Sequence, residues 1–400
     1  MAGRFDPLTR TAVRGGRTTV PTGTAQQPED VRTPTGAGAD AAAETGPTPR
    51  LGADAAAEPG PTPRLGAGAA AETGPTPRLG AAAETGPTAR PGAGGRVREW
   101  EPEGAVDLGL TLGPLRRGPA DPTFRTTPDG SLWKASRTPE GPATLRVALR
   151  HSTGTVHAEA WGPGAEWMLD SLPALLGSGD DPAAFVPRHR LLHASHRRRP
   201  GLRLTRTGLV LESLIPTVLE QKVTTDEAYR AWRRLVCRYG EPAPGPQEGG
   251  PQGLYVMPDA RTWALIPSWD WHKAGVDAKR SAAIVRCARV ANRLEEAAAM
   301  ELPQATARLE AVPGIGPWTS AETLQRSNGA ADAVTTGDLH LPGIIGYALA
   351  GNRDADDAAM LELLAPYAGQ RHRAARLILL AGQAPPRRAP KMRKTDIGKL

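Results

Sequence analysis

The pattern of apolar and polar positions divides the chain into parts with different expected structure. Residues 1–96 show neither helical nor strand periodicity and contain 17 glycines and 13 prolines. Residues 105–161 show alternation, as in TLRVALR at 144–150 and TVHAEAW at 155–161, which predicts β-strands separated by Pro/Gly turns. From residue 206 to about residue 381 the apolar residues recur at helical spacing.

Individual elements follow from this pattern. The alternating Val106, Leu108 and Leu110 predict a strand, and a helix is expected over 164–176. In the helical part, Pro216 should kink or restart a helix over 209–219. Thr225 is expected to cap a helix that ends at Gly240. Further helices are expected over 277–300, 303–312, 318–325, 339–349, 354–364 and 366–381.

The predicted fold class is α+β. A small β-sheet and helix domain over 97–205 is followed by an all-α domain over 206–385 and a basic tail over 386–400. Residues 1–96 are too poor in apolar side chains to offset the entropy of ordering, so we expect a disordered tail. Its repeats, GPTPR at 46, 60 and 74, fit an expanded low-complexity segment, with a flexible arm as the alternative.

Charge and cysteine content exclude several classes. The formal net charge of +7 is concentrated in residues 386–400, which by itself is weak evidence for a nucleic-acid partner. Two cysteines cannot build a disulfide framework, a four-cysteine zinc site or an iron–sulfur cluster. With no apolar run of about 18 residues and no signal peptide, we expect a soluble, cytoplasmic, nucleoid-associated protein with no membrane contact.

The most informative segment is LEAVPGIGPWT at 309–319, a turn between two predicted helices. Gly314 and Gly316 allow a positive φ and a close approach of the backbone to a ligand. The second helix would add free N–H groups and the positive end of its dipole. Such a hairpin can hold a phosphate without reading a base, although an ordinary tight turn would have the same sequence. The candidate phosphate-binding residues are Val312, Gly314, Ile315, Gly316 and Thr319.

An aspartate follows this hairpin at a fixed distance. Asp338 lies in TTGDLH at 335–340, and LEQKVT at 219–224 begins another predicted helix. Together with RTPEGPATLRV at 137–147 and AWGPGAEWMLD at 160–170, these motifs resemble the helix-hairpin-helix DNA glycosylase superfamily. Within it, the chain is similar to the bacterial, actinobacterial-type 3-methyladenine DNA glycosylase II family. The resemblance covers roughly residues 107–390.

The resemblance implies roles for three residues near the end of the hairpin. Asp338 would be the catalytic carboxylate, which stabilises an oxocarbenium-like sugar and orients water; alternatively it caps a helix, and both can hold. Bifunctional members carry a lysine nucleophile where this chain has Trp318, so hydrolysis without strand cleavage is implied. Trp318 would stack on a cationic alkylated purine, or else pack in the core. Leu339, where relatives often have an aromatic, would complete a less aromatic base pocket.

The resemblance also places a DNA wedge at Gln221 and Lys222, which would fill the gap left by an extruded base. Lys222 departs from an apolar wedge. Its methylene stem could fill the gap while its ammonium approaches a phosphate, and a solvated lysine at a helix end is the alternative.

Seven arginines and no acid lie between Arg188 and Arg206. A crossing DNA backbone and a solvated linker explain this run equally well. His189, His193 and His196 could share a helix face, but the surrounding arginines would repel a cation, so no metal site is expected.

The sequence therefore predicts a monofunctional DNA glycosylase of base excision repair. It would flip out alkylated purines of the 3-methyladenine type from duplex DNA, hydrolyse the N-glycosidic bond and leave an abasic site. The alternative is a non-catalytic helix-hairpin-helix protein that binds damaged DNA; a regulator with a base-reading helix lacks a supporting signature. We expect a monomer, duplex DNA with damaged bases as partner, and no cofactor beyond a monovalent cation that the hairpin permits.

Overall fold

The computed structural model describes residues 95–386 and residue 398. The expected disordered tail, its repeats and nearly all of the basic tail lie outside these residues. Order was expected near Val97, and the first strand, β1, spans Arg96–Trp100. The expected mixture of helix and sheet is confirmed.

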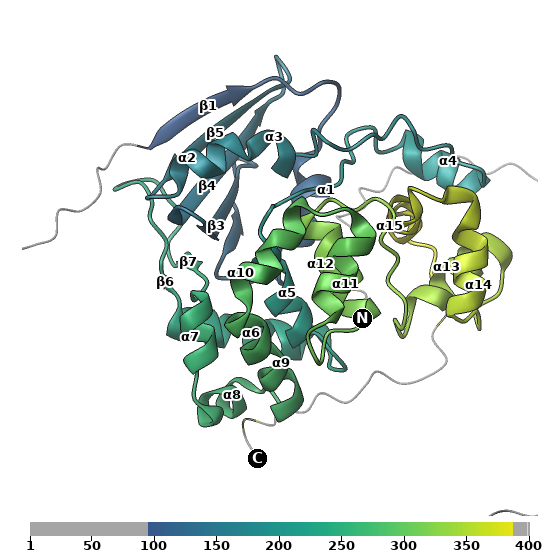
Figure 1. Cartoon of the computed structure of the whole chain (residues 1–400). Helices are drawn as coiled ribbons and strands as arrows, with labels where there is room; N and C mark the ends of the chain where they lie inside the picture. The colour runs from purple at the N-terminus through teal and green to yellow at the C-terminus, as the bar shows by residue number, and fades with distance from the viewer. Residues whose placement is uncertain (1–94, 387–397, 399–400) are drawn as a thin grey trace, which may run out of the picture. The chain divides into compact units, whose positions relative to one another are not determined.

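A five-stranded antiparallel sheet forms the N-terminal part, in the order β1-β5-β4-β3-β2 (Figure 1). Its other strands are β2 Phe124–Thr126, β3 Leu132–Thr138, β4 Gly141–Arg150 and β5 Thr155–Trp161. The register pairs Leu145 with Ala160 and Val147 with Ala158, so their side chains point to one face. Helices α2 Ala165–Asp170 and α3 Leu172–Leu175, which replace the single helix expected over 164–176, cover that face.

The strand expected at Val106, Leu108 and Leu110 is wrong. Leu108–Leu112 is a short helix, α1, followed by the 3₁₀ turn η1 Gly113–Leu115. The side chain of Asp107 caps it by accepting a 2.9 Å hydrogen bond from the backbone N–H of Leu110. Leu108 and Leu112, four residues apart, are both buried, whereas three alternating residues are too few to distinguish a strand from one helical turn.

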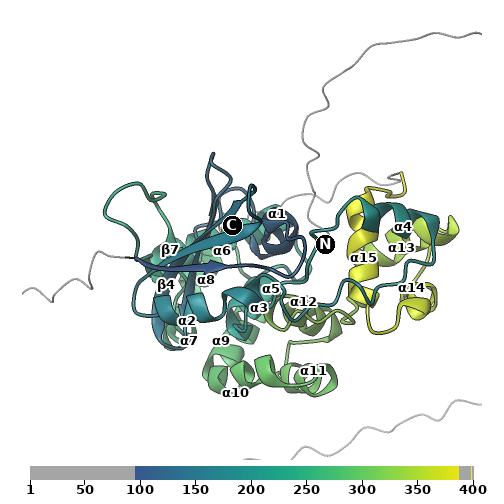
Figure 2. The ribbon, with the colours of Figure 1, turned by 90° about the horizontal axis from the view of Figure 1, so that it is seen from above.

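A first group of helices, labelled in Figure 2, packs around its own apolar core. This core contains the stacked tryptophans Trp232, Trp263 and Trp271. The group consists of α5 Val210–Leu219, α6 Thr225–Tyr239, α7 Ala260–Leu265, α8 Ser268–Ala274, α9 Ala278–Arg289, α10 Ala291–Glu295, η2 Glu296–Ala299, α11 Leu302–Glu310 and α12 Pro317–Ser327. The two-residue strands β6 Glu241–Pro242 and β7 Tyr255–Val256 pair antiparallel between α6 and α7.

Three details of this group differ from expectation. The single helix expected over 277–300 is divided into α9, α10 and η2. Pro216 neither ends nor restarts α5, which continues to Leu219. The cap of α6 is Thr224 and not Thr225: its side chain accepts from the N–H of Glu227, whose carboxylate accepts from the N–H of Thr224 at 2.8 Å. Such a reciprocal pair satisfies two free donors of the first turn, which a single threonine at the next position would not do.

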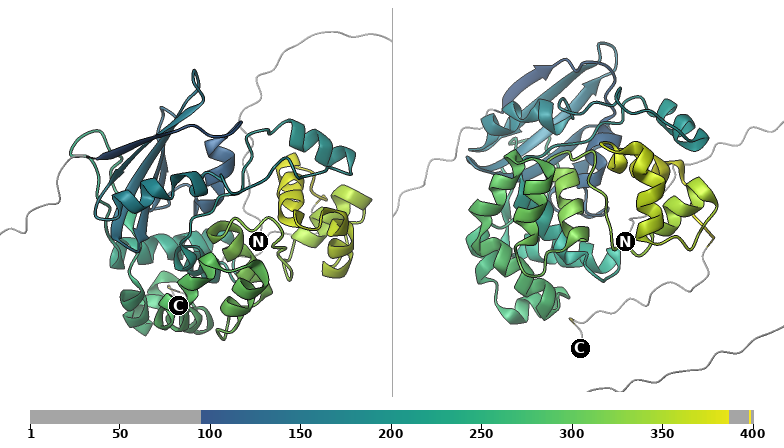
Figure 3. Two further views of the ribbon diagram at one scale, coloured as in Figure 1. Left: turned by 45° about the horizontal axis from the view of Figure 1, so that its top comes forward. Right: turned by 45° about the vertical axis from the view of Figure 1, so that its right-hand side comes forward.

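A second group of helices has a separate core, in which Phe185, Leu192 and Leu202 pack against residues of the C-terminal helices. It consists of α4 Arg190–Arg197, α13 Leu341–Ala350, α14 Asp357–Leu364, η3 Ala365–Tyr367 and α15 Arg371–Ala381. Figure 3 shows α4 beside the yellow C-terminal helices, although it is far from them in sequence. The domain limits 97–205 and 206–385 stay predictions. No helix in the described part of the chain is long and apolar enough to cross a bilayer.

Candidate active site and nucleic-acid interface

The hairpin between α11 and α12 has the geometry of a tight turn. The N–H of Ile315 donates to the carbonyl of Val312 at 3.0 Å, and Gly314 has a φ of 100°. A Cβ at Gly314 would lie 2.9 Å from the Cβ of Ala283, so both conformation and space require glycine there. Gly316 differs from expectation: its φ is −119°, because it is the extended residue just before α12. A Cβ there would meet nothing within 4 Å, so the surface over Gly316 is open.

Within the described part of the chain, three hydrogen bonds hold the side chain of Asp338 in place. Its Oδ1 accepts from the backbone N–H groups of His340 and Leu341, both at 2.8 Å, and its Oδ2 accepts from the indole of Trp318 at 3.0 Å. The first two bonds satisfy free donors at the start of α13, so the expected cap is present. Burial opposes ionisation of Asp338, whereas the hydrogen bonds from His340 and Trp318 favour the ionised carboxylate and act to lower its pKa.

The two residues expected to form the base pocket lie differently. Trp318, in the first turn of α12, is half-buried and directs its indole N–H at Asp338, a contact that the sequence analysis did not foresee. Leu339 is 73% exposed and forms no part of a core. Their roles toward a base stay predictions.

The expected wedge loop connects α5 to α6 and touches the hairpin. The side-chain amide of Gln221 donates to the carbonyl of Gly314 at 3.1 Å and to the hydroxyl of Thr319 at 2.8 Å. Lys222 is exposed and has a φ of 55°; no other non-glycine residue in the described part of the chain has a positive φ. Gln221 thus ties the loop to the hairpin and leaves Lys222 at its tip.

Two carbonyls of the hairpin, where the sequence permits a monovalent cation, accept hydrogen bonds from side chains. Gly314 already accepts from Gln221, and Pro313 accepts from Nε of Arg286 at 2.9 Å. Among the described residues, no group of three His, Cys, Asp or Glu side chains could hold a metal ion. Two of the histidines in the arginine run instead contact aromatic residues: His189 bonds the Tyr367 hydroxyl at 2.6 Å and His196 lies against Phe185.

Two buried ion pairs that the sequence analysis missed connect the N-terminal part to these loops. Arg117, just after η1, binds the carboxylate of Glu220 at 2.7 Å; their side chains are only 5% and 12% exposed. Glu220 immediately precedes Gln221 and Lys222. This pair therefore anchors the wedge loop.

The second pair lies on α12, on the same face as Trp318. Glu322 and Arg326 follow Trp318 at intervals of four residues and bind each other at 2.8 Å. Arg326 also donates to the carbonyl of Pro114 at 3.1 Å, and Glu322 accepts from the hydroxyl of Thr335 at 2.8 Å. Burial opposes ionisation of Glu322, but Arg326 and Thr335 hold its pKa below the ordinary value. Only the spacing on α12 could have indicated this pair.

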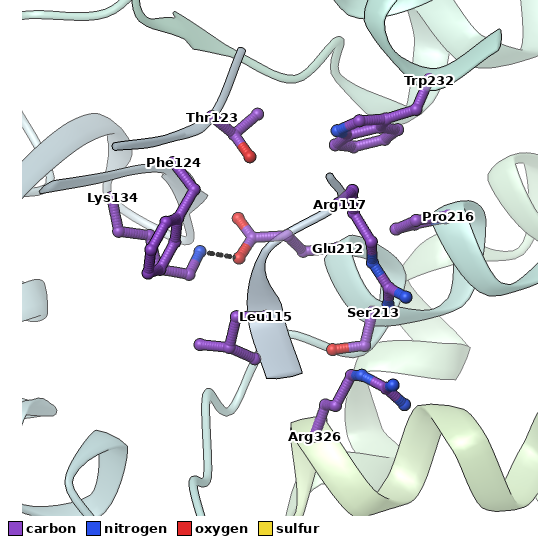
Figure 4. Close-up of a pocket in the computed structure, with 10 residues that line it drawn as sticks. All are labelled: Leu115, Arg117, Thr123, Phe124, Lys134, Glu212, Ser213, Pro216, Trp232 and Arg326. Carbon is purple, nitrogen blue, oxygen red and sulfur yellow. Dashed lines mark hydrogen bonds and ion pairs between the residues drawn. The ribbon is translucent and has the colours of Figure 1, made fainter. Parts of the chain in front are cut away.

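Figure 4 shows a cavity beside both pairs, lined by Arg117 and Arg326 and by the Lys134–Glu212 ion pair. Neither Asp338 nor Trp318 lines it. The cavity therefore belongs to the contact between the sheet and the helices, and not to the candidate active site.

Comparisons with known proteins bear on the fold of the chain. No family model matches the chain. The "probable bifunctional transcriptional activator/DNA repair enzyme AlkA" of two Mycobacterium tuberculosis strains is 30% identical over 171 residues, which are 42% of this chain and 34% of each relative. The chain thus spans about a third of the length of the curated relatives it matches.

Solved structures cover more of the chain. The 3-methyladenine DNA-glycosylase from Archaeoglobus fulgidus superposes on 71% of this chain and 98% of its own, with a TM-score of 0.57 and 20% identity. The 8-oxoguanine glycosylase/lyase from Clostridium acetobutylicum, bound to DNA, covers 71% of this chain and 96% of its own, with a TM-score of 0.55 and 12% identity. The resemblance seen in the sequence is therefore confirmed: the chain has the fold of the helix-hairpin-helix DNA glycosylases, 3-methyladenine glycosylases among them.

Proposed function

We propose that this protein is a monofunctional DNA glycosylase that extrudes an alkylated purine, such as 3-methyladenine, from duplex DNA and hydrolyses its N-glycosidic bond. The observation that carries the proposal is the position of Asp338. Its carboxylate is fixed by three hydrogen bonds in the loop that follows the hairpin and α12. A carboxylate oriented by such bonds suits the stabilisation of positive charge that develops on the sugar.

The rest of the site fits a duplex with one base extruded. The open surface over Gly316, at the start of α12, can accept a phosphate, and Lys222 projects from the neighbouring loop. An alkylated purine with a positive charge is already a good leaving group, so its departure does not require a strong general acid beside Asp338. No lysine occupies the position of Trp318, which supports hydrolysis in place of a covalent sugar intermediate.

The test is base release from duplexes that carry 3-methyladenine or 7-methylguanine, compared with uracil, hypoxanthine and 8-oxoguanine. We expect release from the methylated duplexes, an alkali-labile abasic product and no protein–DNA adduct with borohydride. Asp338→Asn should abolish release while leaving DNA binding nearly unchanged, because it removes the charge and not the hairpin. Asp354→Asn, at an exposed position on the next loop, is the matched control and should release bases normally.

Three results would contradict the proposal. Near-native turnover by Asp338→Asn would show that this carboxylate is not catalytic. A trapped adduct would exclude a monofunctional reaction. Binding to methylated DNA without release by the native protein would favour the non-catalytic damage-binding alternative.

A further inference from the structure

The structure separates the arginine run at 188–206 into two kinds of residue. The first kind donates to backbone carbonyls: Arg188 to Pro366 at 3.2 Å, Arg199 to Leu380 at 2.6 Å, Arg203 to Ala105 at 3.1 Å and Arg206 to Ala298 at 2.7 Å. These four side chains hold segments together, although Arg188 and Arg206 are themselves exposed. Arg190, Arg197 and Arg198 are exposed, and within residues 95–386 no carboxylate lies within ion-pair distance of them.

The exposed cations share one face of α4. Arg190, His193 and Arg197 are spaced by three and four residues, so they lie on one side of the helix, and Arg198 follows at its end. The opposite side carries Leu192 and Ser195, which are buried against α15; the Ser195 hydroxyl donates to the carbonyl of Leu377 at 2.7 Å. The basic face of α4, defined as Arg190, His193, Arg197 and Arg198, is thus fixed in direction by a packed interface.

The segments that form and support this face contain no acidic residue, although Asp180 from the preceding loop pairs with Arg373 of α15. No Asp or Glu occurs between Pro182 and Leu211, and α15, the helix on which α4 packs, contains none. A solvated structural helix normally alternates charges of both signs, because a run of like charge destabilises it. Four cationic or titratable side chains on one outer face, without acids nearby, are complementary to a polyanion.

The position of α4 relates it to the candidate active site. The N-terminal end of α15 is tied to the loop that carries Asp338: the N–H of His372 donates to the carbonyl of Ala331 at 2.8 Å, and Arg371 pairs with Asp332 at 2.5 Å. The other end of α15 carries α4 (Figures 1 and 2). The ten helical residues from 371 to 380 rise by about 14 Å from the first to the last, which corresponds to roughly four base pairs of B-form DNA.

We propose that the basic face of α4 is a second contact for the phosphodiester backbone of duplex DNA, several base pairs from the extruded base. This inference rests on the proposed function for the identity of the ligand. The contact reads no sequence, since it consists of arginines directed at phosphates. It lengthens the footprint of the protein on the duplex that flanks the lesion.

The test compares two triple variants of the full chain that remove the same charge. Arg190→Gln/Arg197→Gln/Arg198→Gln removes the basic face, and Arg150→Gln/Arg233→Gln/Arg261→Gln removes three exposed arginines on the sheet, α6 and α7. Each is titrated with a 25-base-pair and a 9-base-pair duplex that carry a central abasic site, between 50 and 200 mM salt. Both variants keep the basic tail, so its contribution cancels.

We expect the α4 variant to bind the long duplex at least about tenfold more weakly than the control variant at 0.1 M salt, with the slope of log K against log salt reduced by about 2 to 3. Binding of the short duplex and single-turnover excision at saturating protein should equal those of the control. Equal affinities of the two variants for the long duplex, or an equal loss on both duplexes, would overturn the proposal. If the native chain excises no base and the α4 variant still shows this length-dependent loss of binding, the proposed glycosylase activity is refuted and the α4 contact stands.

Discussion

The hydrogen bond from Trp318 to Asp338 separates two roles of one side chain. Trp318→Phe keeps an aromatic face at the start of α12 and removes the N–H that lies 3.0 Å from Oδ2. If Trp318 only stacks on the extruded base, phenylalanine should nearly replace it. If Trp318 positions the carboxylate, the Trp318→Phe variant should release the base much more slowly.

The structure sets the expected size of the effect. A hydrogen bond to a charged acceptor contributes about 1.5–3 kcal/mol, which corresponds to about 10- to 150-fold in rate when the bond acts in the transition state. Asp338 keeps the two backbone donors on Oδ1, so the loop should remain folded. Loss of the third donor should raise the pKa of Asp338, since that bond favours the ionised form.

The assay is single-turnover release of 7-methylguanine from duplex DNA as a function of pH. We expect Trp318→Phe to be slower by about 10- to 150-fold, with the acid limb of the profile moved to higher pH. Trp269→Phe, at a tryptophan 62% exposed on α8, is the matched control and should behave as the native protein. A native rate and pH profile for Trp318→Phe, together with a large loss for Trp318→Ala, would refute the positioning role and support stacking.

Three further predictions concern stability and its pH dependence. Gly314→Ala should destabilise the fold by about 1–3 kcal/mol in urea unfolding and weaken DNA binding, because Gly314 has a positive φ and a close neighbour. Gly316→Ala should be nearly neutral in urea unfolding, since Gly316 has neither. Equal effects of the two substitutions would contradict the geometry. Arg117→Met should lower the free energy of unfolding by about 3–5 kcal/mol in the same experiment, since it leaves the largely buried carboxylate of Glu220 unpaired. Arg150→Met, which breaks an exposed pair, should lower it by less than about 1 kcal/mol. Similar losses for the two variants would show that the Arg117–Glu220 pair is solvated. Burial, together with nearby arginines, holds the pKa of His372 well below its ordinary value. The unfolded chain therefore takes up the proton first, and the free energy of unfolding falls as the pH drops below about 6.5. His372→Gln should flatten this decline between pH 7 and 5 by up to about 1.4 kcal/mol per pH unit, and an unchanged slope would exclude His372 as its source.

Local signals of the sequence predicted much of the fold and of the candidate site. The turn at 313–316, the aspartate 22 residues later and the alternating strands at 144–161 each depend on neighbours in the chain, and the structure has the corresponding elements. Boundaries were less accurate where one residue decides them. The cap of α6 moved to Thr224 because the glutamate that completes the capping box lies three residues later.

Contacts between distant segments could not be predicted in this way. Arg117 pairs with Glu220 across 103 residues, and Arg326 binds Pro114 across 212. Nothing in the sequence near these residues indicates a partner. The arginine run at 188–206 likewise looked uniform, and only tertiary structure separates the arginines that hold carbonyls from those that face solvent.

The amide of Gln221 joins two loops that come from different helices. Because it binds both Gly314 and Thr319, the tip at Lys222 cannot shift relative to the hairpin without breaking two hydrogen bonds. Under the proposed function, the gripped phosphate and the gap in the base stack are then kept at a constant separation along the strand. The position of the extruded base would then be fixed by its distance along the strand from the bound phosphate. A bulged nucleotide between that phosphate and the gap would move the damaged base out of reach of Asp338.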